Sequence, residues 1–438
     1  MPASSVNGKG DERLTLKEVI AMGVGGMVGG GIFSVLGLAI AQAGHAAPIA
    51  FTIGGIIALL TGLSYSRLGL HYQSDGGSFT FLEHAFRNRN IAGIGGWLLL
   101  TGYVGTMALY AWTFGVYGMA MLGEGRQNPA MHHLLESLIL LTFLGVNLYG
   151  VKASGRSELI IVTIKVLILL LFGIIGLQYA RSDYLLPLFN QRVAGVFMGA
   201  ALIFVAYEGF ELIPNAVNEM QQPQRNLQRG IIGSIAITIF IYVLVSLVAV
   251  GNLLPGEIAR AGEYALAVAA KPFLGEAGFL LIGLAALFST ASAINATLFG
   301  TARLGMIMAS ENALPGVFCF RSQARDIPWL SLVVITALTL AFVNLANLTI
   351  ISSFASSTFL LIFSAINFTA WKLRRKLGNR GGLALIGALL SLACWLVLLI
   401  YLWQSAADSL LWIGLTYLAV IIAELAFSKR RLFFPPLA

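Results

Sequence analysis

The residue with the most distinctive chemistry is a lysine inside an apolar run. Lys165 lies within residues 160–171, which are otherwise aliphatic except for Thr163. It follows Arg156 by nine residues, so a helical rise of about 1.5 Å per residue places it roughly 13 Å into a bilayer core about 30 Å thick. An ammonium group is costly at that depth, which predicts a proton carrier or a built-in cation. The alternatives are a structural lysine bound to carbonyls and a snorkelling side chain, and the depth disfavours the second.

A stretch of backbone near the N-terminus is suited to binding charged groups. Residues 23–31 are mostly glycine, and glycine weakens a helix by about 1 kcal/mol per residue relative to alanine. Since lipid cannot satisfy freed backbone groups, we expect a helix broken inside the protein, with free amides that bind a carboxylate and carbonyls that bind an ammonium. The amides are those of Gly29, Gly30, Gly31 and Ile32, and the carbonyls are those around Gly25, Gly26 and Met27. The alternative is close helix packing, which needs only one glycine face.

Two carboxylates and two hydroxyls within apolar runs are further candidates. Glu208 and Glu211 are three residues apart, on roughly one helical face, and would bind an amine or relay a proton. Alternatively, Glu211 caps a broken helix and Glu208 faces a watery vestibule. Ser289 and Ser292 also share a face and would bind an ion, or else bond their own helix.

Aromatic and imidazole side chains give weaker signals. Tyr103 and Tyr207 would line a cavity, although packing is the commoner role of such residues. His132, His133 and Glu136 lack the spacing of a helical zinc motif, so we expect no metal site.

Composition fixes the elements that must position these groups. The 438 residues are 58% hydrophobic and 11% charged, whereas soluble domains carry about 25% charged residues. This predicts an all-α polytopic membrane protein and disfavours a soluble enzyme. We expect about twelve transmembrane helices, since apolar runs long enough to cross a bilayer occur at 17–42, 47–70, 91–122, 132–151, 157–180, 193–217, 229–250, 276–311, 329–346, 349–371, 382–403 and 409–428.

The distribution of basic residues predicts the orientation. With the N-terminus inside, 21 of the 27 Lys and Arg residues lie on the inner side and 5 on the outer side, with Lys165 in the membrane. The bias predicts cytoplasmic termini and a multi-pass protein of the plasma membrane. The positive charge would then face anionic membrane lipids, and no nucleic-acid partner is expected.

The first and sixth runs are both interrupted, the sixth by Gly209 and Pro214. An odd spacing of five runs reverses orientation, so the pattern predicts two inverted repeats around a midplane site. A short interfacial helix is expected at 263–270. The expected parts are an N-terminal tail (1–16), a first repeat (17–180), a second repeat (193–374), two further helices (382–428) and a C-terminal tail (429–438).

Several motifs together resemble those of amino-acid permeases of the amino acid–polyamine–organocation superfamily. Four motifs carry this resemblance. They are Gly29-Gly30-Gly31-Ile32-Phe33, Tyr207-Glu208-Gly209-Phe210-Glu211, Pro223-Gln224-Arg225-Asn226, and Ala302-Arg303 through Glu311-Asn312-Ala313-Leu314-Pro315. The likeness is greatest to the proton-coupled, broad-specificity ApcT-type branch, on Gly155-Arg156-Ser157-Glu158 followed by Lys165, and on 264–274.

The resemblance implies a LeuT-like fold of two inverted five-helix repeats plus two C-terminal helices, with alternating access around an amino-acid site. The implied substrate-binding residues are Met27, Gly29, Gly30, Gly31, Ile32, Val205, Glu208 and Gly209. The Lys165 ammonium would replace a sodium ion and bond the Gly25 carbonyl and a hydroxyl of Ser289 or Ser292. Glu208 departs from the neutral residue common in several branches.

The implied activity is import of an L-amino acid, a small-molecule substrate, by proton symport. The proton would be the coupling ion, and no sodium, other cofactor, catalytic residue or obligate protein partner is expected. The alternatives are a proton-independent amino-acid exchanger and a non-transporting sensor or partner subunit.

Overall fold

The computed structural model describes most of the chain between the two tails. Residues 1–12 and 428–438 lie outside the described part, so the predicted C-terminal tail and most of the N-terminal tail are not described. The described ranges are 13–74, 76–86, 88–123, 128–150, 155–320, 327–378 and 380–427.

The described chain is almost entirely helical, with one isolated β-bridge between Leu14 and Met220. In the first half the α-helices and 3-10 helices (η) are α1 (Leu16–Met27), α2 (Gly30–Ala43), η1 (Gly44–Ala46), α3 (Ala47–Tyr72), α4 (Gly77–Ala85), α5 (Arg89–Met121), α6 (Pro129–Tyr149), α7 (Gly155–Tyr179) and α8 (Ser182–Leu185). In the second half they are α9 (Val193–Leu202), η2 (Phe204–Tyr207), η3 (Phe210–Glu219), α10 (Pro223–Asn252), α11 (Pro255–Ala261), η4 (Gly262–Tyr264), α12 (Ala265–Ala269), α13 (Lys271–Ser310), η5 (Gly316–Cys319), α14 (Trp329–Leu345), α15 (Leu348–Lys372), α16 (Gly382–Ser405) and α17 (Ala407–Phe427).

The long apolar helices confirm the predicted all-α polytopic class. Within the described residues, nine helices are long and apolar enough to cross a membrane, or ten if the bent pair Val193–Leu202 and Phe204–Glu219 counts as one span. One of the nine, Gly30–Tyr72, covers parts of two predicted runs, and the apolar helix Trp329–Leu345 is shorter, at 17 residues. Twelve membrane crossings therefore remains a prediction.

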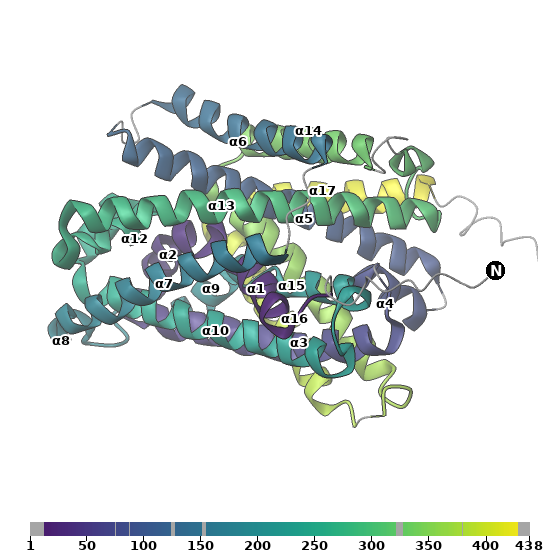
Figure 1. The fold of residues 1–438 in the computed structure, drawn as a ribbon. Helices are drawn as coiled ribbons and strands as arrows, with labels where there is room; N and C mark the ends of the chain where they lie inside the picture. Colours follow the sequence, from purple (N-terminus) through teal and green to yellow (C-terminus); the bar gives the residue numbers. More distant parts are fainter. Residues whose placement is uncertain are drawn as a thin grey trace, which may run out of the picture.

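The broken first segment lies at the centre of the bundle. Figure 1 shows α1 and α2 between α10 with α3 on one side and α13 with α5 on the other. α1 packs against α7, α10 and α13, and α2 packs against α5 and α9. Val28, Ile32 and Phe33 are completely buried. Protein atoms rather than lipid thus surround the break, as an interrupted membrane helix requires.

A local sequence motif sets where α1 begins. Thr15 caps α1, since its hydroxyl accepts from the Glu18 amide at 3.4 Å while the Glu18 carboxylate accepts from the Thr15 amide at 2.8 Å. This reciprocal pair is a capping box. The predicted short helix at 263–270 is confirmed as η4 and α12, at the end of the bundle opposite α4 (Figure 1).

Candidate functional site

The first segment breaks between Met27 and Gly30. The two residues between them leave helical geometry, with φ/ψ of −78°/60° at Val28 and −99°/−142° at Gly29. The amides of the first turn of α2 have no partner within their own helix, which leaves Gly30, Gly31 and Ile32 as donors. The Gly29 amide was predicted to be free, but it donates to the Met27 carbonyl at 2.8 Å. That part of the prediction was wrong because the chain closes a tight turn at the break.

The sixth segment is interrupted as predicted. α9 ends at Leu202 and the chain continues as two 3-10 helices, with a bend of 52°. Between these helices Gly209 has φ +123°, and Pro214 lies within η3. A proline removes a backbone donor and clashes with a regular α-helix, which explains the change of helix type.

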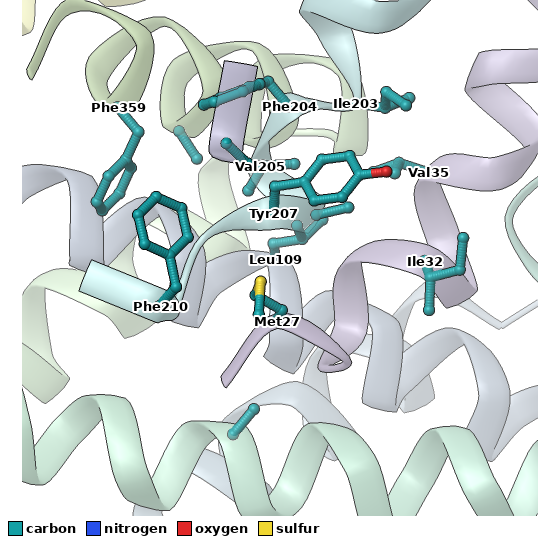
Figure 2. Packing of buried hydrophobic residues seen from close by; sticks show 14 of the residues in the cluster. Met27, Ile32, Val35, Leu109, Ile203, Phe204, Val205, Tyr207, Phe210 and Phe359 are labelled. Carbon is teal, nitrogen blue, oxygen red and sulfur yellow. The ribbon is translucent and has the colours of Figure 1, made fainter. Parts of the chain in front are cut away.

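The two breaks contact each other directly. A Cβ added to Gly26 would lie 3.0 Å from the Gly209 Cα, so no side chain fits between the two backbones. The Tyr242 hydroxyl of α10 lies 2.5 Å from the Met27 carbonyl and 2.7 Å from the Ala206 carbonyl, one on each break. Figure 2 shows both breaks, with Met27 where α1 ends and Tyr207 and Phe210 along the sixth segment.

The glycines of the first break serve close packing as well as chain interruption. None of those in 23–31, all of which are described, has a positive φ. A Cβ on Gly31 would lie 2.7 Å from the Ala206 Cα, and one on Gly30 would lie 2.9 Å from the Tyr110 ring. The packing alternative therefore applies here together with the predicted break.

The carbonyls at the end of α1 all accept from buried donors. Tyr110 donates to the Gly26 carbonyl at 3.1 Å. Lys165, only 2% exposed, donates to the carbonyls of Gly25 at 3.0 Å and Val28 at 2.7 Å. A cation is stabilised at the C-terminal end of a helix, so this lysine holds α7 against the end of α1. Of these, the Gly25 and Gly26 carbonyls each retain a second lone pair.

The two serines do not make the lysine contact that the resemblance implied. The Ser289 hydroxyl donates to the Val28 carbonyl, which also accepts from Lys165. The Ser292 hydroxyl donates to the Glu158 carboxylate at 3.3 Å. The prediction that a serine hydroxyl bonds the Lys165 ammonium was therefore wrong. Ser289 bonds a carbonyl that Lys165 also bonds, and Ser292 bonds Glu158.

The two carboxylates of the sixth segment have different surroundings. Glu208 is 1% exposed; its Oε2 accepts from the Thr106 hydroxyl of α5, and its Oε1 has no hydrogen-bond partner in the described chain. Glu211 Oε2 accepts from the Gly209 amide at 2.7 Å, which is the capping contact that we had considered as an alternative. The interior placement of Glu208 does not match a watery vestibule.

The remaining residues of the predicted site are held by hydrogen bonds and a ring contact. The Tyr207 hydroxyl donates to the Phe51 carbonyl at 2.6 Å. The Val205 amide donates to a serine hydroxyl of α15 at 2.9 Å. The Tyr103 ring lies 5.3 Å from the Phe359 ring, edge to face. These residues form part of the wall around the breaks.

Cavities lie on both sides of the breaks. One of about 490 Å³ runs beside α2, and Ser34, Gly37 and His45 are among its lining residues. Ser34 also donates to the Gly30 carbonyl at 3.0 Å, so this cavity reaches within one turn of the break. Another cavity, of about 590 Å³, includes Tyr72 in its lining at the α4 end.

The sequence pattern of the family described as amino acid permease matches residues 14–425. The chain belongs to this family. The permease is 35% identical over 420 residues to an uncharacterized protein of Methanocaldococcus jannaschii, with 96% of each chain covered. It is 32% identical over 422 residues to the inner membrane transport protein YbaT of Escherichia coli, covering 94% of this chain and 96% of that one.

A solved structure shows the same fold. The manganese transporter of Eremococcus coleocola, in its H236A mutant, superposes with a TM-score of 0.58 at 14% identity, over 98% of this chain and 97% of that one. The permease thus has the LeuT-like all-α fold. Its family is one of membrane transporters rather than enzymes.

One residue of the permease was not singled out for a role from the sequence. Glu158 lies on α7, seven residues before Lys165, and contacts Ser292 of α13. A spacing of seven residues is two helical turns, which places both side chains on one face. That spacing was the sequence signal that could have identified Glu158 as a partner of Lys165.

We expect Tyr242→Phe to reduce transport by more than the accompanying loss of stability explains. The change removes the hydroxyl whose single proton is shared between a carbonyl of each break, and losing this buried donor costs about 1–3 kcal/mol. The measurement is uptake together with thermal unfolding. Tyr65→Phe is the matched control, since it removes a buried hydroxyl that bonds Ser78 at 2.6 Å. Equal loss of transport in both variants would contradict a specific role for Tyr242.

Proposed function

We propose that this permease imports amino acids by proton symport across the plasma membrane, with both termini in the cytoplasm. The observation that carries the proposal is the position of Lys165. Its buried ammonium bonds two carbonyls at the end of α1, beside the break. A membrane-buried lysine at such a place is a natural proton carrier.

The substrate would bind by its two charged groups. The amides of Gly30, Gly31 and Ile32 stand at the positive end of α2, where an anionic carboxylate is favoured. On the other break, Glu208 Oε1 has no hydrogen-bond partner among the described residues although the side chain is buried. A buried carboxylate oxygen without a partner is unfavourable, and a substrate ammonium would satisfy it. This arrangement suits a zwitterionic amino acid.

In this proposal, the coupling of proton release to conformational change depends on the contacts that hold α1 in place. Protonated Lys165 links α7 to α1, and Ser289 links α13 to the same Val28 carbonyl. When Lys165 loses its proton, the charge-assisted part of the α7–α1 link is lost, and such bonds are roughly twice as strong as neutral ones. Proton release would then favour the conformation that opens towards the cytoplasm.

The test uses purified protein. A thermal-shift screen of amino acids identifies the ligands, because a ligand that binds the native state stabilises it. The best ligand is then followed into proteoliposomes, in sodium-free buffer, with and without an inward proton gradient. We expect net uptake only with the gradient. Counterflow without net uptake would identify an exchanger, binding without flux would identify a sensor, and dependence on sodium would refute proton coupling.

We expect Glu208→Gln to weaken amino-acid binding by about tenfold, equivalent to about 1.4 kcal/mol. Glutamine keeps the shape and an acceptor for Thr106 but removes the carboxylate that would contact the substrate ammonium. The measurement is ligand affinity by calorimetry. Glu219→Gln is the matched control, since that carboxylate is 59% exposed and lies 3.7 Å from Arg303. An unchanged affinity in Glu208→Gln would remove Glu208 from the site.

A further inference from the structure

Glu158 of α7 contacts both α13 and α1. Its Oε2 accepts from Ser292 of α13 at 3.3 Å. Its Oε1 occupies the space where a Cβ on Gly25 of α1 would stand. Lys165, on the same helix as Glu158, bonds the carbonyl of this same Gly25 at 3.0 Å. The carboxylate and the ammonium therefore meet α1 at the same residue.

Among the described residues, Lys165 is the one whose charge acts electrostatically on Glu158. The helices with extensive packing against α7 are α1, α10 and α13. Next to Glu158, α1 supplies Gly25 and α13 supplies Ser292, both uncharged. The charged residues of these three helices lie toward helix ends and are Lys17, Glu18, Arg225, Arg229, Lys271, Glu276 and Arg303.

The position of Glu158 along α7 sets the direction in which a proton would pass between Lys165 and Glu158. Glu158 lies in the first turn of α7, and Lys165 lies about 10 Å farther along the helix. In the proposed orientation the start of α7 faces the cytoplasm. A proton that leaves Lys165 for the cytoplasm therefore has Glu158 next on its way, and carboxylates are common members of such relays in membrane proteins.

We propose that Glu158 receives the proton that Lys165 releases and passes it to the cytoplasmic side, an inference that rests on the proposed symport. In this step an N–H bond of the Lys165 ammonium breaks and leaves a neutral amine. The proton neutralises the Glu158 carboxylate and then passes to cytoplasmic water, which restores the carboxylate. Both groups contact Gly25, so a movement of α1 would change the geometry between donor and acceptor.

The decisive comparison is between net uptake and exchange. Net uptake requires proton release in every cycle, whereas exchange of internal for external substrate can proceed with the proton retained. We expect Glu158→Gln to reduce gradient-driven net uptake roughly tenfold or more, as loss of a proton-transfer group does, and to retain exchange near the wild-type level. An alkaline vesicle interior should partly restore net uptake, and Glu158→Asp should restore it further.

Two controls keep the result interpretable. Glu276→Gln changes an exposed carboxylate that pairs with Lys271 at 2.8 Å, and it should leave both activities unchanged. Equal loss of exchange and net uptake in Glu158→Gln, without rescue by an alkaline interior, would show a structural role and overturn the inference, as would full net uptake. Failure of the wild-type protein to respond to a proton gradient would instead refute the proposed symport.

Discussion

Replacing Lys165 by alanine should abolish amino-acid uptake driven by an inward proton gradient. The change removes the ammonium that bonds the carbonyls of Gly25 and Val28, so α1 loses these hydrogen bonds to α7 and the protein loses its proposed proton carrier. Ser289 still donates to Val28, so we expect the protein to fold. The measurement is initial uptake rate in proteoliposomes, with ligand binding as a check that the site survives.

The control for Lys165 lies on the same helix. Thr163 is exposed, and its hydroxyl bonds the Leu159 carbonyl of α7 itself at 2.6 Å, so Thr163→Ala should transport normally. Lys165→Met, which keeps the length of the aliphatic stem, should be as inactive as Lys165→Ala. Undiminished gradient-driven uptake in either lysine variant would remove Lys165 from the mechanism.

Gly209→Ala should reduce uptake by more than tenfold and lower the thermal stability. A Cβ there would lie 2.5 Å from the carbonyl carbon of Gly26, and overpacking of this kind costs about 1–3 kcal/mol. The φ of +123° adds strain, since left-handed backbone costs an L-residue roughly 1–2 kcal/mol. The two breaks would be forced apart. The measurements are uptake and the apparent unfolding temperature of the purified protein.

A second glycine separates backbone strain from the clash. Gly378 has φ +67° with no atom within 4 Å of an added Cβ, so Gly378→Ala carries strain without displacing a neighbour. We expect a small loss of stability and normal uptake in this control. If both variants lost transport equally, the contact between the breaks would not be the cause.

The backbone of the site could be predicted because its signals are local. The glycines of 23–31 and the Gly209–Pro214 pair weaken a helix wherever they stand, and both breaks lie where the sequence indicates. Burial of the breaks was also predictable, since lipid would not tolerate them. The exception is the Gly29 amide, which donates to the Met27 carbonyl in a tight turn. Residue propensities do not predict that the chain closes this turn.

The partners across the site could not be predicted from one sequence. Tyr242 is 215 residues from Met27, and Thr106 is 102 residues from Glu208. Which residues face these positions depends on the rotation of each helix, and a run that is apolar on all sides gives little indication of its rotation. The same uncertainty led to the wrong partner for Ser289 and Ser292.

The contact of Gly26 with Gly209 has a mechanical consequence. With bare backbone on both sides and a tyrosine hydroxyl bonded to each, neither segment can change its bend without altering the space available to the other. A movement of either interruption is therefore coupled to the other. Under the proposed function, a substrate bound at the breaks would act on both segments at once, without a longer chain of intermediate contacts.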